Sequence, residues 1–338
     1  MENNHDCCKT KKKKWYKEPF FLILIFITLI SLSNIFLKNF GIELLDPAIT
    51  KFWEYIKQTW WAILLGVIIG GLIDLFIPEE FIVKVLNGGR KSIIPAVFLG
   101  FLASACSHGI LIIAISLFRK GASTASTLAF LLAAPWANIA ITVLLFSLFG
   151  LKALLIIIGA LLIAIISGLI FQVLEEKGII ESNKNIQDKQ INKIKWALKG
   201  PGESMKILAK SSLSLSKMVI WWVLLGFLLA SIIGTYLPDE IFNNYFGPNI
   251  LGLFITLLLA TVMEICSEGT APMAFELFKK TGAFGNSFVF LQAGVVTDFT
   301  EIGIITTNIG KKAAIAMVIV CVPLVIISGF LLNTFVKF

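Results

Sequence analysis

The chain has 338 residues, of which 57% are hydrophobic and 15% are charged, and its mean hydropathy is +0.88. This composition excludes a disordered chain and argues against a soluble enzyme, because a soluble protein of this size cannot bury so much apolar surface. The net charge of +8 comes from basic residues between long apolar runs. We interpret it as a signal for orientation in a membrane, and we expect no nucleic-acid partner.

Apolar runs follow one another along the chain and predict an all-α polytopic membrane protein. The first run, 20–37, follows a Lys-rich tail and is predicted to be a retained span, since no small-residue cleavage site comes after it. Eight further runs cover 59–78, 92–118, 124–149, 151–174, 217–237, 249–278, 283–306 and 312–334. We expect four parts: a basic tail with the first span (1–58), a first repeat (59–174), a Lys-rich linker (175–216) and a second repeat (217–338).

The two repeats are inferred from matching sequence features at an offset of about 160 residues. Trp60-Trp61 matches Trp221-Trp222, and Cys106-Ser107-His108-Gly109 matches Cys266-Ser267-Glu268-Gly269. The segments beginning at Ile77, Phe118 and Phe130 also match those beginning at Leu237, Phe278 and Phe290, and Asn138 matches Asp298. Several matches in one frame indicate a duplication.

Charge predicts how the repeats are oriented. The tail and the linker are both rich in lysine, so we expect both on the cytoplasmic side of the plasma membrane. An even number of crossings must then separate them, whereas five apolar runs lie between. We predict that the run 92–118 is a re-entrant hairpin, because basic residues flank both of its ends. Each repeat then has three crossings, which makes the second copy inverted. If all nine runs cross, the repeats are parallel.

The matching Cys-Ser-X-Gly segments interrupt an apolar run in each half. Irregular backbone inside a membrane is tolerated where protein buries it or where it lines a wet cavity, and paired interruptions point to a central binding site. We expect helix breaks at Gly109, Pro135, Gly269 and Pro272. We predict that the substrate is bound by Cys106, Ser107, His108, Asn138, Cys266, Ser267, Glu268 and Asp298.

Two pseudo-symmetric pairs would form if the interruptions meet: Cys106 with His108, and Cys266 with Glu268. Thiolate and imidazole groups suit Zn²⁺, Cu(I) or trivalent arsenic, so these four residues are candidate metal ligands. In the alternative interpretation, the cysteines are small buried hydrophobic side chains and His108 bonds a neighbouring carbonyl.

Carboxylates within the apolar runs of the second half predict proton coupling at Glu264, Glu268, Asp298 and Glu301. A carboxylate in the middle of a bilayer costs about 2.5–3.5 kcal/mol on insertion scales, so each one needs a partner, a proton or water. Symmetry supports Glu268 and Asp298, whose counterparts are polar, but not Glu301, whose counterpart is Ile141. A further carboxylate, Glu276, precedes two lysines and is expected near the membrane surface.

The segments that carry these motifs, 103–140 and 263–303, resemble the ArsP/YraQ-type predicted permease family. The resemblance extends over most of 59–334 outside the linker and implies a polytopic permease. Some members of that family are linked to export of trivalent organoarsenicals or of metals. The family's first motif usually reads Cys-Ser-Cys, whereas His108 stands at the later position here, so Cys106 is the matched thiol.

We therefore predict a membrane permease, not an enzyme, that exports a small thiophilic or metal-type solute by alternating access between two repeats. The chain has no G-x-x-x-x-G-K-[ST] loop, so we expect no ATP hydrolysis, and we expect no cofactor. Its predicted partners are the lipid bilayer and the solute. The alternatives are an ion channel and an intramembrane enzyme that uses Cys106 and His108, although an i, i+2 spacing is awkward for such a pair.

Overall fold

The computed structural model describes residues 19–39, 45–76, 92–99, 107–119, 121–137, 139–183, 213, 220–221, 223–263 and 267–336. Within these ranges the chain is helical and has no strand. The first half contains α1 (Pro19–Asn39), α2 (Asp46–Phe76), α4 (Ile93–Leu99), α5 (Ser107–Arg119), α6 (Thr124–Ala137), α7 (Ile139–Phe149) and α8 (Ala153–Glu176). The second contains a helix at Val223–Tyr236, α10 (Asp239–Phe246), α11 (Ile250–Met263), α12 (Ser267–Thr281), α13 (Phe284–Val296), α14 (Phe299–Asn308) and α15 (Lys311–Phe335).

Three helical stretches in the described part of the chain are long and apolar enough to cross a membrane: Ile139–Glu176, Phe284–Asn308 and Lys311–Phe335. A fourth is present if Val223–Tyr236 and Asp239–Phe246, which meet at 105°, count as one span. Many large apolar side chains on these helices are exposed, including Leu162, Ile319 and Ile327. Because such surfaces need a nonaqueous surrounding, the protein is an integral membrane protein.

The helices follow the apolar runs, although several runs divide into two helices, such as 283–306 into α13 and α14. Two further features were not expected. The α2 helix begins at Asp46 and passes without interruption through residue 58, where we expected the first part of the chain to end. The short α10 helix was not anticipated, because it carries acidic residues in its first turn and has low overall hydrophobicity. Its single buried side chain, Phe242, packs beside Phe246 at a ring distance of 6.1 Å.

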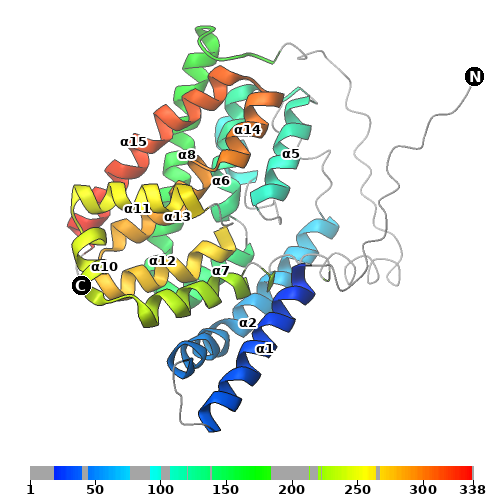
Figure 1. Cartoon of the computed structure of the whole chain (residues 1–338). Coiled ribbons are helices and arrows are strands. Elements are labelled where there is room, and N and C mark those ends of the chain that lie inside the picture. The colour runs from blue at the N-terminus through cyan, green and yellow to red at the C-terminus, as the bar shows by residue number, and fades with distance from the viewer. Residues whose placement is uncertain are drawn as a thin grey trace, which may run out of the picture.

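The core lies between the paired helices α6–α8 and α13–α15, whose contacts are among the most extensive in the described structure (Figure 1). Glycines allow the close approach within the second pair. A side chain at Gly285 of α13 would overlap the carbonyl oxygen of Gly329 on α15. Small residues at helix crossings are the usual means by which membrane helices pack closely.

Side chains at helix ends hold the starts of neighbouring helices. Both carboxylate oxygens of Glu175, at the end of α8, accept hydrogen bonds from the amides of Thr124 and Ala125, at 3.2 and 3.0 Å. The Asn333 side chain, near the end of α15, accepts from the amide of Gly285 at 2.7 Å. Both contacts satisfy amides that the first turn of a helix leaves without an internal acceptor.

The start of α15 is held by Glu181, which follows α8 and accepts hydrogen bonds from the amides of Lys312 and Ala313, at 3.0 and 2.8 Å. Desolvation alone would raise the pKa of Glu181, but these amides and the Lys312 charge outweigh it and lower that pKa below 4.5. The lowered pKa means that the stabilisation is present above pH 4.5 and is lost as the pH falls through the folded-state value.

We expect Glu181→Gln to lower stability slightly at neutral pH, by about 0.3–1 kcal/mol, the usual value of an anion at a helix start. Thermal melting in detergent should separate the two proteins at pH 7, and the difference should shrink towards pH 3. An equal difference at both pH values would show that the carboxylate charge does not stabilise this contact.

Candidate functional site

The α13 and α14 helices are separated by a two-residue interruption, Thr297-Asp298, that lies inside the protein. Both residues are buried. Asp298 caps α14, and its Oδ1 accepts hydrogen bonds from the amides of Thr300 at 2.7 Å and Glu301 at 3.2 Å. These bonds satisfy two amides at the start of α14 and fix the position of the buried carboxylate.

Glu301 lies in the first turn of α14 and is only 1% exposed. Its Oε2 has no hydrogen-bond partner among the residues that the structure describes. The Asp298 carboxylate is close enough to act on it electrostatically. Two buried carboxylates therefore share one interruption, although symmetry with the first repeat supported only Asp298. A carboxylate buried inside a membrane needs a partner, a proton or water.

The end of α11 lies beside the interruption between α13 and α14. Thr261, near the end of α11, and Thr297 are joined by a hydrogen bond of 2.6 Å between their hydroxyls. The α12 helix then begins at Ser267, whose hydroxyl donates to Oε2 of Glu268 at 3.2 Å. Residues 264–266 lie outside the described residues. The Thr261–Thr297 bond thus joins the end of α11 to the interruption between α13 and α14.

The glycines and prolines that we expected at helix breaks lie within helices instead. Gly109 is in the first turn of α5, Pro135 is near the end of α6, and Gly269 and Pro272 are in α12. The carbonyl of Gly269 touches Gly226 so closely that a side chain at position 226 would overlap it. Pro272 lies in the second turn of α12 and has no amide hydrogen to donate within the helix.

Four short helices (the half-helices) form two contacting pairs, α5 with α14 and α7 with α12. The ends of α5 and α14 are joined by a 2.6 Å hydrogen bond from Arg119 to Asn308, and the two helices run side by side (Figure 1). Asp298 is ten residues before Asn308, and Gly109 is ten residues before Arg119, which is about 15 Å along each helix. The start of α5 is therefore level with the Asp298 interruption.

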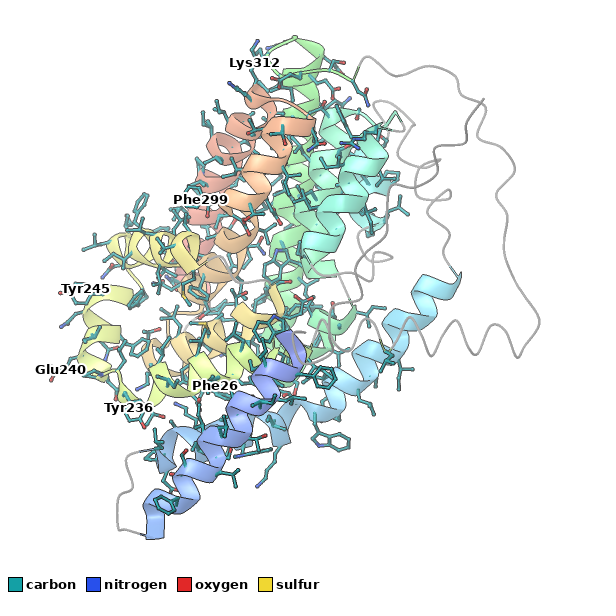
Figure 2. All side chains as sticks on the ribbon, turned by 45° about the vertical axis from the view of Figure 1, so that its right-hand side comes forward. Phe26, Tyr236, Glu240, Tyr245, Phe299 and Lys312 are labelled. Atoms are coloured by element: carbon teal, nitrogen blue, oxygen red, sulfur yellow. The ribbon has the colours of Figure 1, made fainter. Side chains whose placement is uncertain are left out.

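The other two half-helices extend in the opposite direction. Near its end, α7 contacts α12 through the ring pairs Phe149–Phe275 and Phe149–Phe278, at 5.3 and 5.9 Å. Ile139 is ten residues before Phe149 and Glu268 is ten residues before Phe278, which is again about 15 Å along each helix. In Figure 2, Phe299, the first residue of α14, lies between Lys312 at one end of the molecule and Glu240 at the other. We call the region where the four half-helices begin the central region.

The structure describes only part of the predicted site. Ser267, Glu268, Asp298 and Glu301 are buried in or beside the central region. Ser107 and His108 begin α5, but their side chains lie outside the described part of the structure. Four further predicted residues lie entirely outside the described part of the structure: Cys106, Asn138, Glu264 and Cys266. In the described residues no three His, Cys, Asp or Glu side chains form a metal-binding group. The ligand set Cys106, His108, Cys266 and Glu268 stays a prediction.

Sequence reasoning found no partner for one buried charged group. Glu276, expected near the surface, is 2% exposed and receives hydrogen bonds from Lys51 and Tyr55 of α2. The lysines at 279 and 280 suggested a solvated position, but α2 covers this part of α12. Thr261 and Thr297 were also missed; Thr297 could have been found from its position directly before Asp298.

Comparisons with known proteins point to transport. The family model ArsP_1, described as "Predicted permease", matches residues 47–334. The UPF0718 protein YcgR of Bacillus subtilis (strain 168) is 25% identical over 282 residues, which cover 80% of this chain and 91% of that protein. A Streptococcus mutans protein named "Putative two-component membrane permease complex subunit" is 24% identical over 251 residues, or 71% of this chain and 79% of that one. No solved structure matches the chain.

Proposed function

This chain belongs to the ArsP_1 family of predicted permeases, and we propose from this premise that it is a secondary transporter working by alternating access between two inverted repeats. The helix order supports the repeats. The helices of the two halves pair in order: α5 with α12, α6 with α13, α7 with α14 and α8 with α15. Each pair is separated by nearly the same offset as the matching sequence motifs. The two helix starts held by Glu175 and Asn333 also correspond, since Ala125 and Gly285 stand at matching positions in that frame.

The directions of the corresponding helices support inversion. The start of α15 lies beside Glu181, just after the end of α8, and the two helices also touch midway, where Cys321 Sγ donates to Ser167 Oγ at 3.3 Å. They therefore run antiparallel. Two repeats related by a pseudo-two-fold axis in the membrane plane place corresponding helices in opposite directions, which is the arrangement of many secondary transporters.

The positions of two pairs of helices support re-entrant hairpins. The α4 helix starts beside the start of α6, where the hydroxyls of Ser92 and Ser126 share a hydrogen bond, and α5 ends just before the same helix. In the second half, α11 starts after Gly247, whose carbonyl accepts from Asn286 of α13 at 3.1 Å, and α12 ends just before α13. Each pair thus enters and leaves at one end, which supports our prediction for 92–118.

The observation that carries the proposal is the convergence of four half-helix starts with buried carboxylates. Helix starts concentrate partial positive charge and free amides, and interrupted helices at mid-membrane form the binding sites of secondary transporters. We place the substrate in the central region, with proton coupling by Asp298, Glu301, Glu268 and Glu264. Cys106 and Cys266 directly precede the starts of α5 and α12, so a thiophilic or metal-type solute fits this region best.

We propose export from the cytoplasm across the plasma membrane, with the tail and the linker on the cytoplasmic side. The linker begins directly after α8, so this orientation assigns the end that carries Glu181 and Lys312 to the cytoplasm. Both segments are rich in lysine, and positively charged segments are retained on that side.

Flux into sealed vesicles containing the purified protein tests the proposed function. A panel of trivalent arsenicals, Zn²⁺, Cu(I) and small anions should contain at least one solute with saturable uptake. Alanine at Cys106 or Cys266, or Glu268→Gln, should abolish that uptake without changing membrane insertion. Turnover that persists in detergent would indicate an enzyme, and flux that does not saturate would indicate a channel. Normal uptake in all three variants would contradict the proposed site.

A further inference from the structure

A buried ion pair joins the two halves of the protein away from the central region. Glu276 lies in α12, and both oxygens of its carboxylate are bonded to α2: Lys51 Nζ donates to Oε1 and Tyr55 OH donates to Oε2. Lys51 and Tyr55 are four residues apart, so they lie on one face of α2. Glu276 is 2% exposed and Tyr55 is 3% exposed, while the Lys51 side chain is 21% exposed.

The helix Val223–Tyr236 closes over this group, which we call the latch (Lys51, Tyr55 and Glu276). Phe227 stacks on the Tyr55 ring at 5.5 Å with an interplanar angle of 15°. Gly234 lies so close to the ion pair that any side chain at that position would overlap Glu276 and Lys51. Three helices therefore meet tightly at the latch, and separating α2 from α12 requires the ion pair to break.

The latch lies towards one end of the molecule. The α12 helix extends from the central region to Lys280, which pairs with Asp239 at 2.5 Å, so Glu276 lies towards the end that carries α10. In Figure 2 this end, marked by Tyr236 and Glu240, is opposite Lys312. At an offset of 160 residues from Lys51, Tyr55 and Glu276, the sequence has Ser211, Leu215 and Ser116. These residues cannot form an ion pair, so the latch has no counterpart at this offset.

We propose that the latch is the closed gate at the end of the transport path opposite the linker, and that it must open once in each cycle. This inference rests on the proposed alternating access. A buried ion pair adds little net stability compared with apolar packing, because desolvation offsets the attraction, but it is costly to leave one partner alone. Such a contact suits a gate: it favours one fully formed arrangement over partly open ones.

Hydrogen–deuterium exchange of the full chain in lipid nanodiscs, without added solute, tests the gate. We expect Glu276→Gln to raise exchange in residues 45–55 and 270–281 about tenfold, as for the loss of a charge-assisted hydrogen bond, with α15 unchanged. The exchanged pair Lys51→Glu with Glu276→Lys should restore protection. Asp239→Asn, which breaks the exposed pair at the same end, is the matched control and should raise exchange in α2 far less than Glu276→Gln does.

Unchanged exchange in Glu276→Gln would overturn the proposal, and so would protection that the exchanged pair fails to restore. If Glu276→Gln does not fold, Tyr55→Phe provides the test, since it keeps the ring and removes one hydrogen bond. We expect a smaller rise in exchange, confined to the same segments. Unchanged exchange in Tyr55→Phe would overturn the gate. A failure of the proposed function would look different. The variants would still change hydrogen–deuterium exchange as expected, but vesicles containing the wild-type protein would show no uptake of any solute.

Discussion

Replacing Asp298 by asparagine is expected to abolish transport and to leave the protein folded. Asparagine caps a helix about as well as aspartate, so the hydrogen bonds to the amides of Thr300 and Glu301 survive. The negative charge in the central region is lost. Uptake in sealed vesicles should fall to the level of vesicles without protein, while thermal melting in detergent stays close to that of the wild type.

Two further variants make this result specific. Asp298→Ala should also destabilise the protein by about 1 kcal/mol, because it removes the helix cap. Glu301→Gln should remove accumulation driven by a pH gradient while exchange of solute for solute continues, since it removes an ionisable group and not the cap. Full gradient-driven uptake by both Asp298→Asn and Glu301→Gln would exclude these carboxylates from transport.

Replacing Gly285 by valine is expected to be among the most destabilising substitutions in the chain. The new side chain would overlap the carbonyl oxygen of Gly329, and a backbone atom of a packed helix cannot rotate away as a side chain can. The contact between α13 and α15 would have to open, and the Asn333 bond to the Gly285 amide would be strained. Overpacking costs about 1–3 kcal/mol where side chains can adjust, and we expect at least the upper value here.

Gly303→Ala is the matched control for this substitution. Gly303 also lies in a helix, α14, but no described atom lies within 4 Å of the position that its Cβ would take. Alanine there should be neutral or stabilising by up to about 1 kcal/mol, from helix propensity. Melting of both variants in the same detergent gives the comparison. Equal melting temperatures would show that α13 and α15 do not depend on their close approach.

The positions of the helices could be predicted because apolar runs mark them directly. The α15 helix, Lys311–Phe335, differs from the run 312–334 by one residue at each end. The run 249–278 divides into α11 and α12, with the division just before Ser267, close to the predicted interruption. The α10 helix could not be found in this way, since its acidic residues and low hydrophobicity give no apolar run.

The individual site residues were less predictable, because pairing depends on contacts between distant segments. Symmetry pointed to Asp298, which is buried, but it gave no support to Glu301. Glu301 lies in the first turn of α14, close to Asp298, because the helix begins directly after Asp298. Glu276 was expected near the surface from its neighbouring lysines. Its burial depends on α2, which lies near the other end of the sequence, and no local pattern contains that information.

Gly269 illustrates the same limit for the backbone. Its position in a Cys-Ser-Glu-Gly segment suggested a break in the helix, whereas α12 continues through it and the residue lies against Gly226. A glycine that permits close packing and a glycine that permits an irregular backbone look identical in a sequence. Only the neighbouring helix distinguishes the two roles.

The most direct test of a transport site in the central region is saturable uptake of the solute panel by sealed vesicles containing wild-type protein, Asp298→Asn or Asp239→Asn. Both substitutions remove one carboxylate charge, but Asp298 lies among the half-helix starts, whereas the Asp239 side chain is 72% exposed at the end that carries α10. We predict equal saturable uptake by the wild type and Asp239→Asn and none by Asp298→Asn. Equal uptake by all three proteins, or no uptake of any solute by the wild type, would contradict the account.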